Sequence, residues 1–186
     1  ATDEVLAQLS PALRKSVNLG SDVEYFRQPL PSATLTRALN GGLPYGRQSL
    51  IWGAKSAAKS SLCLQIVAMA QAEGKTAAWI DAEQSFDYNW AESLGVKTNE
   101  LIYSEAKTTN DMANAGTSLM DAGIDVLVVD SISALLPAIY FEKDSTELKN
   151  LENTKQIGAD SKDMGGAVKM LNFANKKTLL ILISQQ

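Results

Sequence analysis

The sequence predicts an α/β fold: a mostly parallel sheet with helices on both faces, preceded by an N-terminal helix and an arm. Two patterns predict it. From Arg47 onward, short apolar segments of strand length alternate with longer segments whose apolar residues have helical spacing. The short segments are apolar throughout instead of alternating apolar with polar residues, which is typical of parallel strands covered on both faces.

The first 33 residues predict a helix followed by an arm. Residues 2–15 are amphipathic, with Thr2 as a cap, an acidic first turn and a basic last turn. Pro11 should kink or divide this helix. Residues 18–32 hold two prolines and a glycine without a sustained period, which indicates an extended arm. The arm packs on its own core, which we expect over residues 34–186, or on a neighbour; an ordinary appendage is the alternative.

The core elements follow one another at regular intervals. Each of the first three core helices ends at a glycine, and two apolar strands end at an aspartate. We expect strands over residues 49–52, 76–80, 101–104, 125–129 and 178–183, and helices over residues 59–73, 88–94, 109–122 and 164–175. In such sheets ligands bind beyond the carboxyl ends of the strands. The residues that follow the strands are therefore the functional candidates: 53–61, 81–83, 130–131 and 184–186.

Composition excludes several kinds of function. The 186 residues contain no histidine, which removes Ser-His-Asp triads, histidine bases and histidine-ligated metals. Cys63 is the only cysteine, so the chain forms no intrachain disulfide or zinc ribbon, and a reducing cytoplasm suits it. The net charge of −4 argues against a nucleic-acid grip by bulk charge. No apolar run reaches the roughly 20 residues of a membrane helix, and the acidic first residues do not resemble a signal peptide.

A phosphate-binding loop is predicted between the first core strand and its helix. The pattern G-x-x-x-x-G-K-[ST] is matched except that Ala58 replaces the second glycine. Backbone N–H groups and the helix N-terminus form an anion cradle there, while Lys59 reaches phosphates and Ser60 ligates Mg²⁺. If the slot needs a helical φ, Ala58 fits and stiffens the turn; only glycine tolerates a positive φ without strain. The loop residues expected to contact a nucleotide are Gly53, Ala54, Lys55, Ser56, Ala57, Ala58, Lys59, Ser60 and Ser61.

The end of a second strand, at Asp130, favours nucleotide binding over a simpler interpretation of the loop after the first core strand. The simpler interpretation is a strand-to-helix turn whose serines cap the helix. Asp130 ends the apolar strand over residues 125–129, where a carboxylate usually orders Mg²⁺. The alternative for Asp130 is a cap on the next turn, which Ser131 and Ser133 also favour. Two matching strand ends in one chain favour an ATP·Mg²⁺ site.

These residues, taken with their flanking motifs, resemble a known family. From residue 36 to residue 185 the chain is similar, in order, to the ATPase core of RecA-type recombinases. The missing loop glycine resembles the divergent bacteriophage branch. The motifs that carry the resemblance are Leu39-Asn40-Gly41-Gly42-Leu43-Pro44-Tyr45-Gly46-Arg47, the phosphate loop, Glu73-Gly74-Lys75-Thr76, Ile80-Asp81-Ala82-Glu83, Leu94-Gly95-Val96, Val128-Val129-Asp130-Ser131, Ile157-Gly158 through Met164-Gly165, and 179–185.

The resemblance implies a role for each of four further side chains. Glu83 would activate the attacking water, which agrees with the absence of histidine; a solvated surface acid is the alternative. Asp87 and Trp90 would lie against adenine, although Trp90 could instead belong to the core. Gln185 would sense the γ-phosphate and signal to the DNA-binding loops, or simply cap a strand. With Glu83 and Gln185, Lys59 completes the expected catalytic set.

Three departures from the family pattern limit the prediction. Lys55 stands where the bacterial proteins carry an acid. The expected first DNA-binding loop, residues 139–163, holds six acids and four lysines, so it offers no phosphate grip by itself. Its Tyr140 and Phe141 could stack on bases, or the loop is simply solvated. The family's second DNA-binding loop and its cross-subunit lysines would lie beyond residue 186.

The resemblance therefore implies an ATP-dependent recombinase that binds single-stranded DNA and acts in homologous recombination and repair. Such a protein is a DNA-dependent ATPase with ATP and Mg²⁺ as cofactors, here weakened by Ala58. Residues 1–33 would be its oligomerisation arm, stacking subunits head to tail into a helical filament. We expect it in a bacterial cytoplasm, with or without a viral origin, and away from membranes. The alternatives are a paralogue that binds DNA or partners with little hydrolysis, and an unrelated phosphate-loop enzyme such as a small-molecule kinase.

Overall fold

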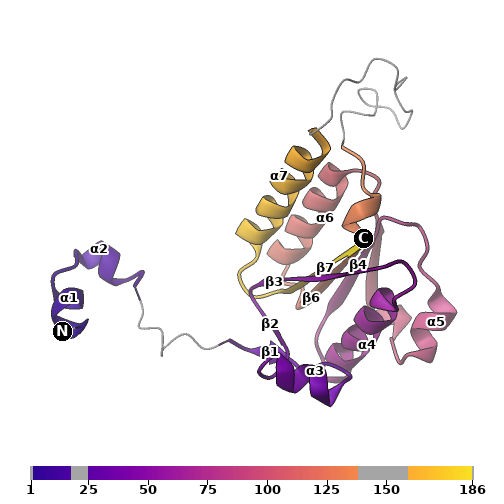
Figure 1. Ribbon diagram of the computed structural model, residues 1–186, viewed down its shortest axis with the longest axis horizontal. Helices are drawn as coiled ribbons and strands as arrows, with labels where there is room; N and C mark the ends of the chain where they lie inside the picture. Colours follow the sequence, from indigo (N-terminus) through magenta and orange to yellow (C-terminus); the bar gives the residue numbers. More distant parts are fainter. Residues whose placement is uncertain (1, 18–24, 138–158, 186) are drawn as a thin grey trace.

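The computed structural model describes residues 2–17, 25–137 and 159–185, and its centre is a five-stranded parallel sheet (Figure 1). The strand order is β3-β7-β6-β4-β5, and every pairing is parallel. This confirms the predicted α/β class. The strands are β3 (Gln48–Gly53), β4 (Ala77–Asp81), β5 (Leu101–Glu105), β6 (Val126–Asp130) and β7 (Leu179–Gln185).

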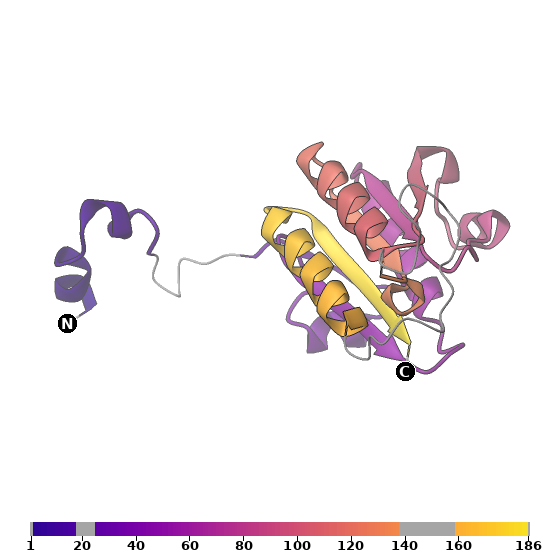
Figure 2. The ribbon, with the colours of Figure 1, turned by 90° about the horizontal axis from the view of Figure 1, so that it is seen from above.

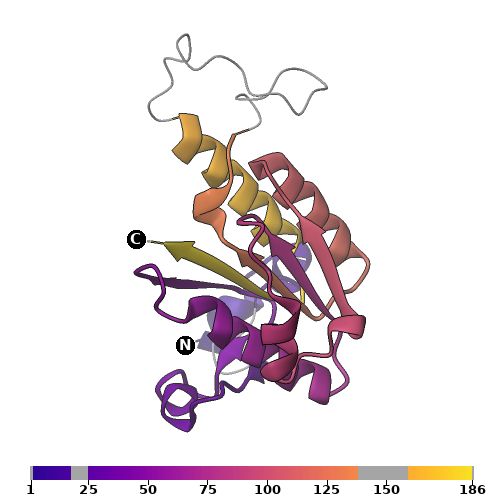
Figure 3. The same cartoon turned by 90° about the vertical axis from the view of Figure 1, so that its right-hand side faces the viewer.

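Helices cover both faces of the sheet, as the continuous apolar strands predicted. Successive side chains of a strand point to opposite faces, so each central strand supplies both layers of the core. On one face Trp79 and Val128 pack against α4 (Lys59–Ala72) and α5 (Tyr88–Ser93). On the other face Ile80 and Leu127 pack against α6 (Thr109–Asp121) and α7 (Ala159–Ala174). Figures 2 and 3 show α6 and α7 side by side along that face.

The predicted N-terminal helix is divided into α1 (Thr2–Ala7) and α2 (Pro11–Arg14). Pro11 is the first residue of α2, and the Ser10 side chain caps it by accepting from the backbone N–H of Leu13. Proline fits this position because the first N–H of a helix has no partner within the helix. No residue of α1 or α2 is buried, so their apolar stripe lacks a partner among the described residues.

The described end of the arm packs on its own core. Arg27–Gln28 form β1, which pairs antiparallel with β2 (Leu43–Pro44), and α3 (Ala33–Ala38) lies between them in sequence. Gln28 is fully buried and accepts hydrogen bonds from Tyr45 Oη at 2.7 Å and Lys75 Nζ at 3.1 Å. Residues 18–24 lie outside the described ranges, so the course of the rest of the arm stays a prediction. Two 3₁₀ turns, Thr98–Glu100 and Ile132–Ala134, complete the elements.

Candidate nucleotide-binding site

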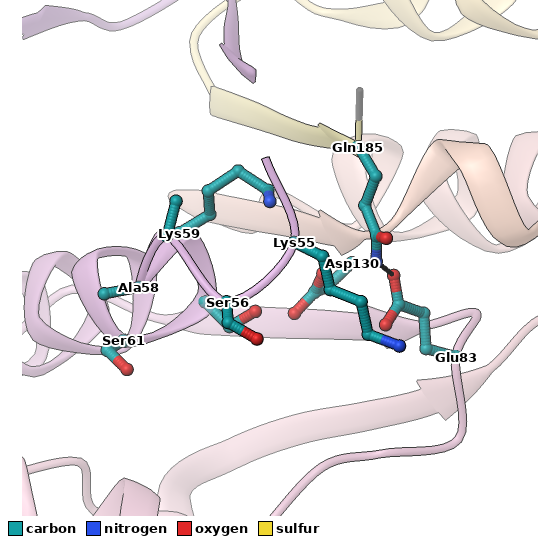
Figure 4. A pocket seen from close by; sticks show the side chains of 10 residues that line it. Lys55, Ser56, Ala58, Lys59, Ser61, Glu83, Asp130 and Gln185 are labelled. Atoms are coloured by element: carbon teal, nitrogen blue, oxygen red, sulfur yellow. Dashed lines mark hydrogen bonds between the residues drawn. The ribbon is translucent and has the colours of Figure 1, made fainter. Parts of the chain in front are cut away.

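The strand ends that the sequence singled out lie together at one edge of the sheet. In the strand pairing Gly53 is opposite Gln185 and Asp81 is opposite Asp130, so the ends match within each of these two pairs. Because Leu182 is opposite Val129, β7 extends further than β6 at the same edge of the sheet. At this edge the loop after β3 borders a pocket of about 420 Å³ together with Glu83, Asp130 and Gln185 (Figure 4). The residues that line it are Lys55, Ser56, Ala57, Ala58, Lys59, Ser60, Ser61, Glu83, Asp130 and Gln185.

The backbone at Ala58 is not helical. Ala58 has φ +58° and ψ 27°, and Ser56 has φ +61°, both in the left-handed region. The slot therefore needs a positive φ, so the condition under which Ala58 would fit without strain and stiffen the turn is not met. A Cβ makes this conformation cost roughly 1–2 kcal/mol, which glycine would avoid.

The N-terminus of α4 carries no side-chain cap. Ala58 is its N-cap residue and makes no capping hydrogen bond. The interpretation of the loop as a turn whose serines cap the helix therefore fails. The first backbone N–H groups of α4 are oriented along the helix axis toward the loop, and the partial positive charge of the helix dipole adds to them. This end of α4 can therefore bind an anion.

Lys59 folds back over the loop that precedes it. Its Nζ donates to the carbonyl oxygen of Gly53 at 3.1 Å and to that of Ala54 at 2.8 Å. Two neutral carbonyls hold the ammonium at the base of the loop without neutralising its charge. A phosphate in the cradle would compete for these donors with full negative charge.

Asp130 and Ser60 form the part of the pocket that suits a hard cation. Asp130 is 7% exposed at the end of β6. Burial raises the pKa of its carboxyl group, the hydrogen bond with Ser60 opposes this rise, and the nearby carboxylate of Glu83 adds to it. A buried carboxylate beside a hydroxyl is stabilised by a cation, since both supply oxygen donors.

Glu83 is held at the mouth of the pocket by two polar side chains. Its Oε1 accepts from Ser131 Oγ at 2.6 Å and from Gln185 Nε2 at 2.5 Å (Figure 4). Its Oε2 accepts no hydrogen bond from the described residues. Glu83 is thus a half-buried, oriented carboxylate and not a solvated surface acid. Gln185, whose backbone N–H donates to Ser133 Oγ at 2.9 Å, directs its side chain across the pocket instead of capping a strand.

Asp81 positions Glu83, a role that the sequence analysis did not assign. The Asp81 carboxylate is 1% exposed and accepts from the backbone N–H groups of Glu83, Ser85 and Phe86, each at 3.0 Å. Tyr103 Oη donates to the same carboxylate at 3.1 Å. These bonds fold the chain after β4 into a fixed turn that presents Glu83 to the pocket. Only the position of Asp81 at a strand end hinted at this role.

Trp90 and Asp87 lie beside the phosphate loop rather than in it. They border a smaller cavity of about 90 Å³ together with Ser60 and Asp130. Trp90 is 50% exposed, which excludes the core alternative, and its Nε1 donates to Ser61 Oγ at 3.2 Å. Asp87 caps α5 by accepting from the backbone N–H of Trp90 at 3.0 Å.

Comparisons with known proteins identify the family. The family model for the RecA N-terminal domain matches residues 15–186. The chain belongs to the RecA family. It is 38% identical over 148 residues to Protein RecA of Bdellovibrio bacteriovorus, covering 78% of this chain and 37% of that protein. It is 36% identical over 177 residues to Protein RecA 2 of Myxococcus xanthus, covering 91% and 48%.

A further relative extends over all of this chain. Protein RecA of Lactobacillus delbrueckii subsp. bulgaricus is 34% identical over 200 aligned positions, which cover 100% of this chain and 58% of the relative. The chain thus spans about half the length of the RecA proteins it matches. The likeness to the bacteriophage branch of the family stays a prediction.

The expected first DNA-binding loop of this RecA-family chain lies mostly outside the described ranges. Its residues 139–158, which include Tyr140 and Phe141, are not described. Asp163, near the end of that loop, lies in α7 and accepts from Thr109 Oγ1 at 2.7 Å. No helix in the described ranges combines the length and apolar character that a membrane crossing needs.

The conformation of Ala58 generates a stability prediction. We expect Ala58→Gly to raise the free energy of unfolding by about 1 kcal/mol, because glycine adopts a positive φ without a Cβ clash. Ala57→Gly is the matched control: Ala57 is not in the left-handed region, so this change should cost about 0.5–1 kcal/mol. Thermal unfolding of both variants measures the difference. An Ala58→Gly variant no more stable than Ala57→Gly would mean that the loop is unstrained.

Burial of Asp130 generates a pH prediction. Its raised pKa means that folding disfavours the ionised form, a cost present above the folded-state pKa and absent once the group is protonated in both states. Asp130→Asn keeps an acceptor for Ser60 and removes the charge. We expect it to raise Tm at neutral pH, with a gain that shrinks as the pH falls toward about 4, where an unperturbed aspartate becomes protonated. Asp3→Asn, at an exposed position, should show neither effect; a gain independent of pH would contradict the burial argument.

Proposed function

We propose that this chain forms the ATPase core of a recombinase that binds ATP with Mg²⁺ and couples hydrolysis to binding of single-stranded DNA. Membership of the RecA family supports this function, and the observation that carries it is the contact of Gln185 with Glu83 beside the phosphate loop. That contact joins a potential base to an amide on the strand next to the loop. The same contact does not support the alternative of an unrelated phosphate-loop enzyme such as a small-molecule kinase.

The residues of the pocket fit both cofactors. The free N-terminus of α4 and Lys59 suit the phosphates of ATP, while Ser60 and Asp130 offer the oxygen donors that Mg²⁺ takes in such sites. Mg²⁺ usually keeps several waters and binds through one or two protein oxygens together with phosphate oxygens. Within the described ranges, no group of three or more acidic, histidine or cysteine side chains is arranged to hold a metal ion by itself. When bound, ATP would supply the phosphoryl group, and Mg²⁺ would offset part of the negative charge of the phosphates.

Glu83 is the proposed base. Its Oε1 is engaged by Ser131 and Gln185, which fix the orientation of the carboxylate. Its Oε2 is left to hold a water and accept the proton as that water attacks. Gln185 is the proposed sensor: its amide can exchange the bond to Glu83 for one to the terminal phosphate, so its position reports which nucleotide is bound.

We propose that adenine and neighbouring subunits bind to surfaces outside the phosphate pocket. We assign the exposed face of Trp90 to adenine stacking, with Asp87 holding α5 in place. Val5 and Leu13 are 63% and 49% exposed on α1 and α2, and we assign this stripe to a neighbouring subunit in a head-to-tail filament. The proposed protein acts on single-stranded DNA in a bacterial cytoplasm; a viral origin stays a prediction.

One observation favours a second candidate, a paralogue that binds nucleotide or DNA with little hydrolysis. The strained φ of Ala58 lies in the loop that must enclose the phosphates. If strain at Ala58 makes the closed loop conformation less favourable, the loop stabilises the transition state less well, and the rate of hydrolysis depends on that stabilisation. The two candidates share the nucleotide site and differ only in turnover.

Substitution of Glu83 tests the proposed function. Glu83→Gln should leave the affinity for ATP within about 3-fold and lower DNA-stimulated hydrolysis at least about 100-fold, because an amide cannot accept the proton of the water. Lys59→Ala should abolish ATP binding. Glu105→Gln, an exposed strand-end control outside the pocket, should change neither. Calorimetry and phosphate release with and without single-stranded DNA measure these effects.

The outcomes separate the candidates. A wild-type chain that binds ATP without releasing phosphate supports the paralogue. Wild-type turnover in Glu83→Gln removes Glu83 as the base. Unchanged ATP affinity in Lys59→Ala overturns the nucleotide site itself.

Trp90 gives an independent prediction about adenine. Trp90→Ala should weaken ATP binding by about 5- to 150-fold, since stacking of a base on an aromatic ring contributes about 1–3 kcal/mol. It should leave the binding of inorganic triphosphate nearly unchanged. Trp52→Ala, at a tryptophan on β3 that is also more than half exposed and lies outside both cavities, is the control. Competition binding with the two ligands measures the difference. Equal losses for both ligands would mean that Trp90 supports the loop and does not stack on adenine.

A further inference from the structure

We propose that the side chain of Lys55 contacts the terminal phosphate of the nucleotide and makes the site prefer ATP over ADP. This inference rests on the proposed nucleotide-binding function. It gives Lys55 a role of its own, distinct from the backbone cradle to which the loop as a whole contributes.

The position of Lys55 is the first observation. Lys55 lies in the loop after β3 and lines the pocket, and its side chain extends across the mouth toward Glu83 (Figure 4). It is exposed and makes no hydrogen bond or ion pair with the described residues. A lysine that reaches over a pocket without a protein partner is free to bind an anionic ligand.

The side chains of Lys55 and Lys59 lie on different sides of the pocket. Lys59 is held at the base of the loop by the carbonyls of Gly53 and Ala54. Lys55 extends to the opposite side, where Glu83 and Gln185 meet. Hydrolysis requires the attacking water to lie in line with the terminal phosphate. The side of the pocket that holds the proposed base is therefore the side of the terminal phosphate, and Lys55 is the cation on that side.

The charge balance of the lining shows why this cation matters. The pocket is lined by two lysines, Lys55 and Lys59, and two acids, Glu83 and Asp130. Without Lys55 the lining would carry a net charge of −1 while binding a nucleotide that is itself anionic. ATP carries one more phosphate group and one more negative charge than ADP, at the end that Lys55 faces. Loss of Lys55 should therefore weaken ATP more than ADP.

Exposure limits the size of the effect and makes it depend on salt. A charge-assisted hydrogen bond to phosphate contributes about 1.5–3 kcal/mol, and solvent screening reduces this at an exposed position. We expect Lys55→Met to lower the affinity for a non-hydrolysable ATP analogue about 10-fold and the affinity for ADP less than about 3-fold at low salt. At about 0.5 M salt the ATP-specific loss should shrink.

The experiment compares three variants of the 186-residue chain by calorimetry with AMP-PNP and ADP, each with Mg²⁺. Lys55→Met removes the charge and keeps the length, and Lys55→Arg keeps the charge and should restore most of the preference for AMP-PNP. Lys169→Met, an exposed lysine on α7 outside the pocket, is the matched control and should bind both nucleotides like the wild type. Thermal unfolding confirms that each variant is folded.

Each outcome decides the proposal. A loss for AMP-PNP that exceeds the loss for ADP, rescued by arginine and reduced by salt, supports it. Equal losses for the two nucleotides, or affinities like the wild type, overturn it. A failure of the proposed function is distinct, because then the wild-type chain does not bind AMP-PNP or Lys59→Ala binds it equally well.

Discussion

The parallel register of the central strands is the constraint on which the site depends. Gly53, Gln185, Asp130 and Asp81 end four neighbouring strands, and the pairing sets Gly53 level with Gln185 and Asp81 level with Asp130. A slip of one residue would turn each of these side chains to the opposite face. The buried strand interiors prevent such a slip, because every apolar residue of β4 and β6 already fills one of the two core layers. Core packing and site geometry are thus set by the same pairing.

Three carboxylates meet at this edge, and each is stabilised differently. Asp81 receives three backbone N–H groups and a tyrosine hydroxyl, which makes it a structural anchor. Glu83 is oriented by side chains on one oxygen and keeps the other available for chemistry. Asp130 is buried with a raised pKa and one serine partner, the arrangement that a cation would stabilise most. The environment of each group, rather than its residue type, decides which of the three can act as base, ligand or anchor.

The sequence predicted the sheet and the outline of the site because buried parallel strands are apolar runs and their ends are polar. It placed Lys59, Glu83, Asp130 and Gln185 correctly at one edge. It missed β1 and β2, since strands of two residues have no measurable period, and it missed α3, which precedes the regular alternation of strands and helices that begins near Arg47. The left-handed φ of Ala58 and the anchoring role of Asp81 were also missed. Both depend on backbone conformation in turns, which residue types alone do not determine.

The start of α4 shows how the site trades stability for binding. A serine or aspartate at the N-cap would stabilise the helix by about 1 kcal/mol but would occupy a backbone N–H group of its first turn. Ala58 forms no such bond, and it holds a strained φ as well. The N–H groups and the helix dipole are therefore left for a ligand, with Lys59 held at the base of the loop and Lys55 reaching over the pocket. An anion that binds there supplies the missing cap, so ligand binding and completion of the helix N-terminus are the same physical event.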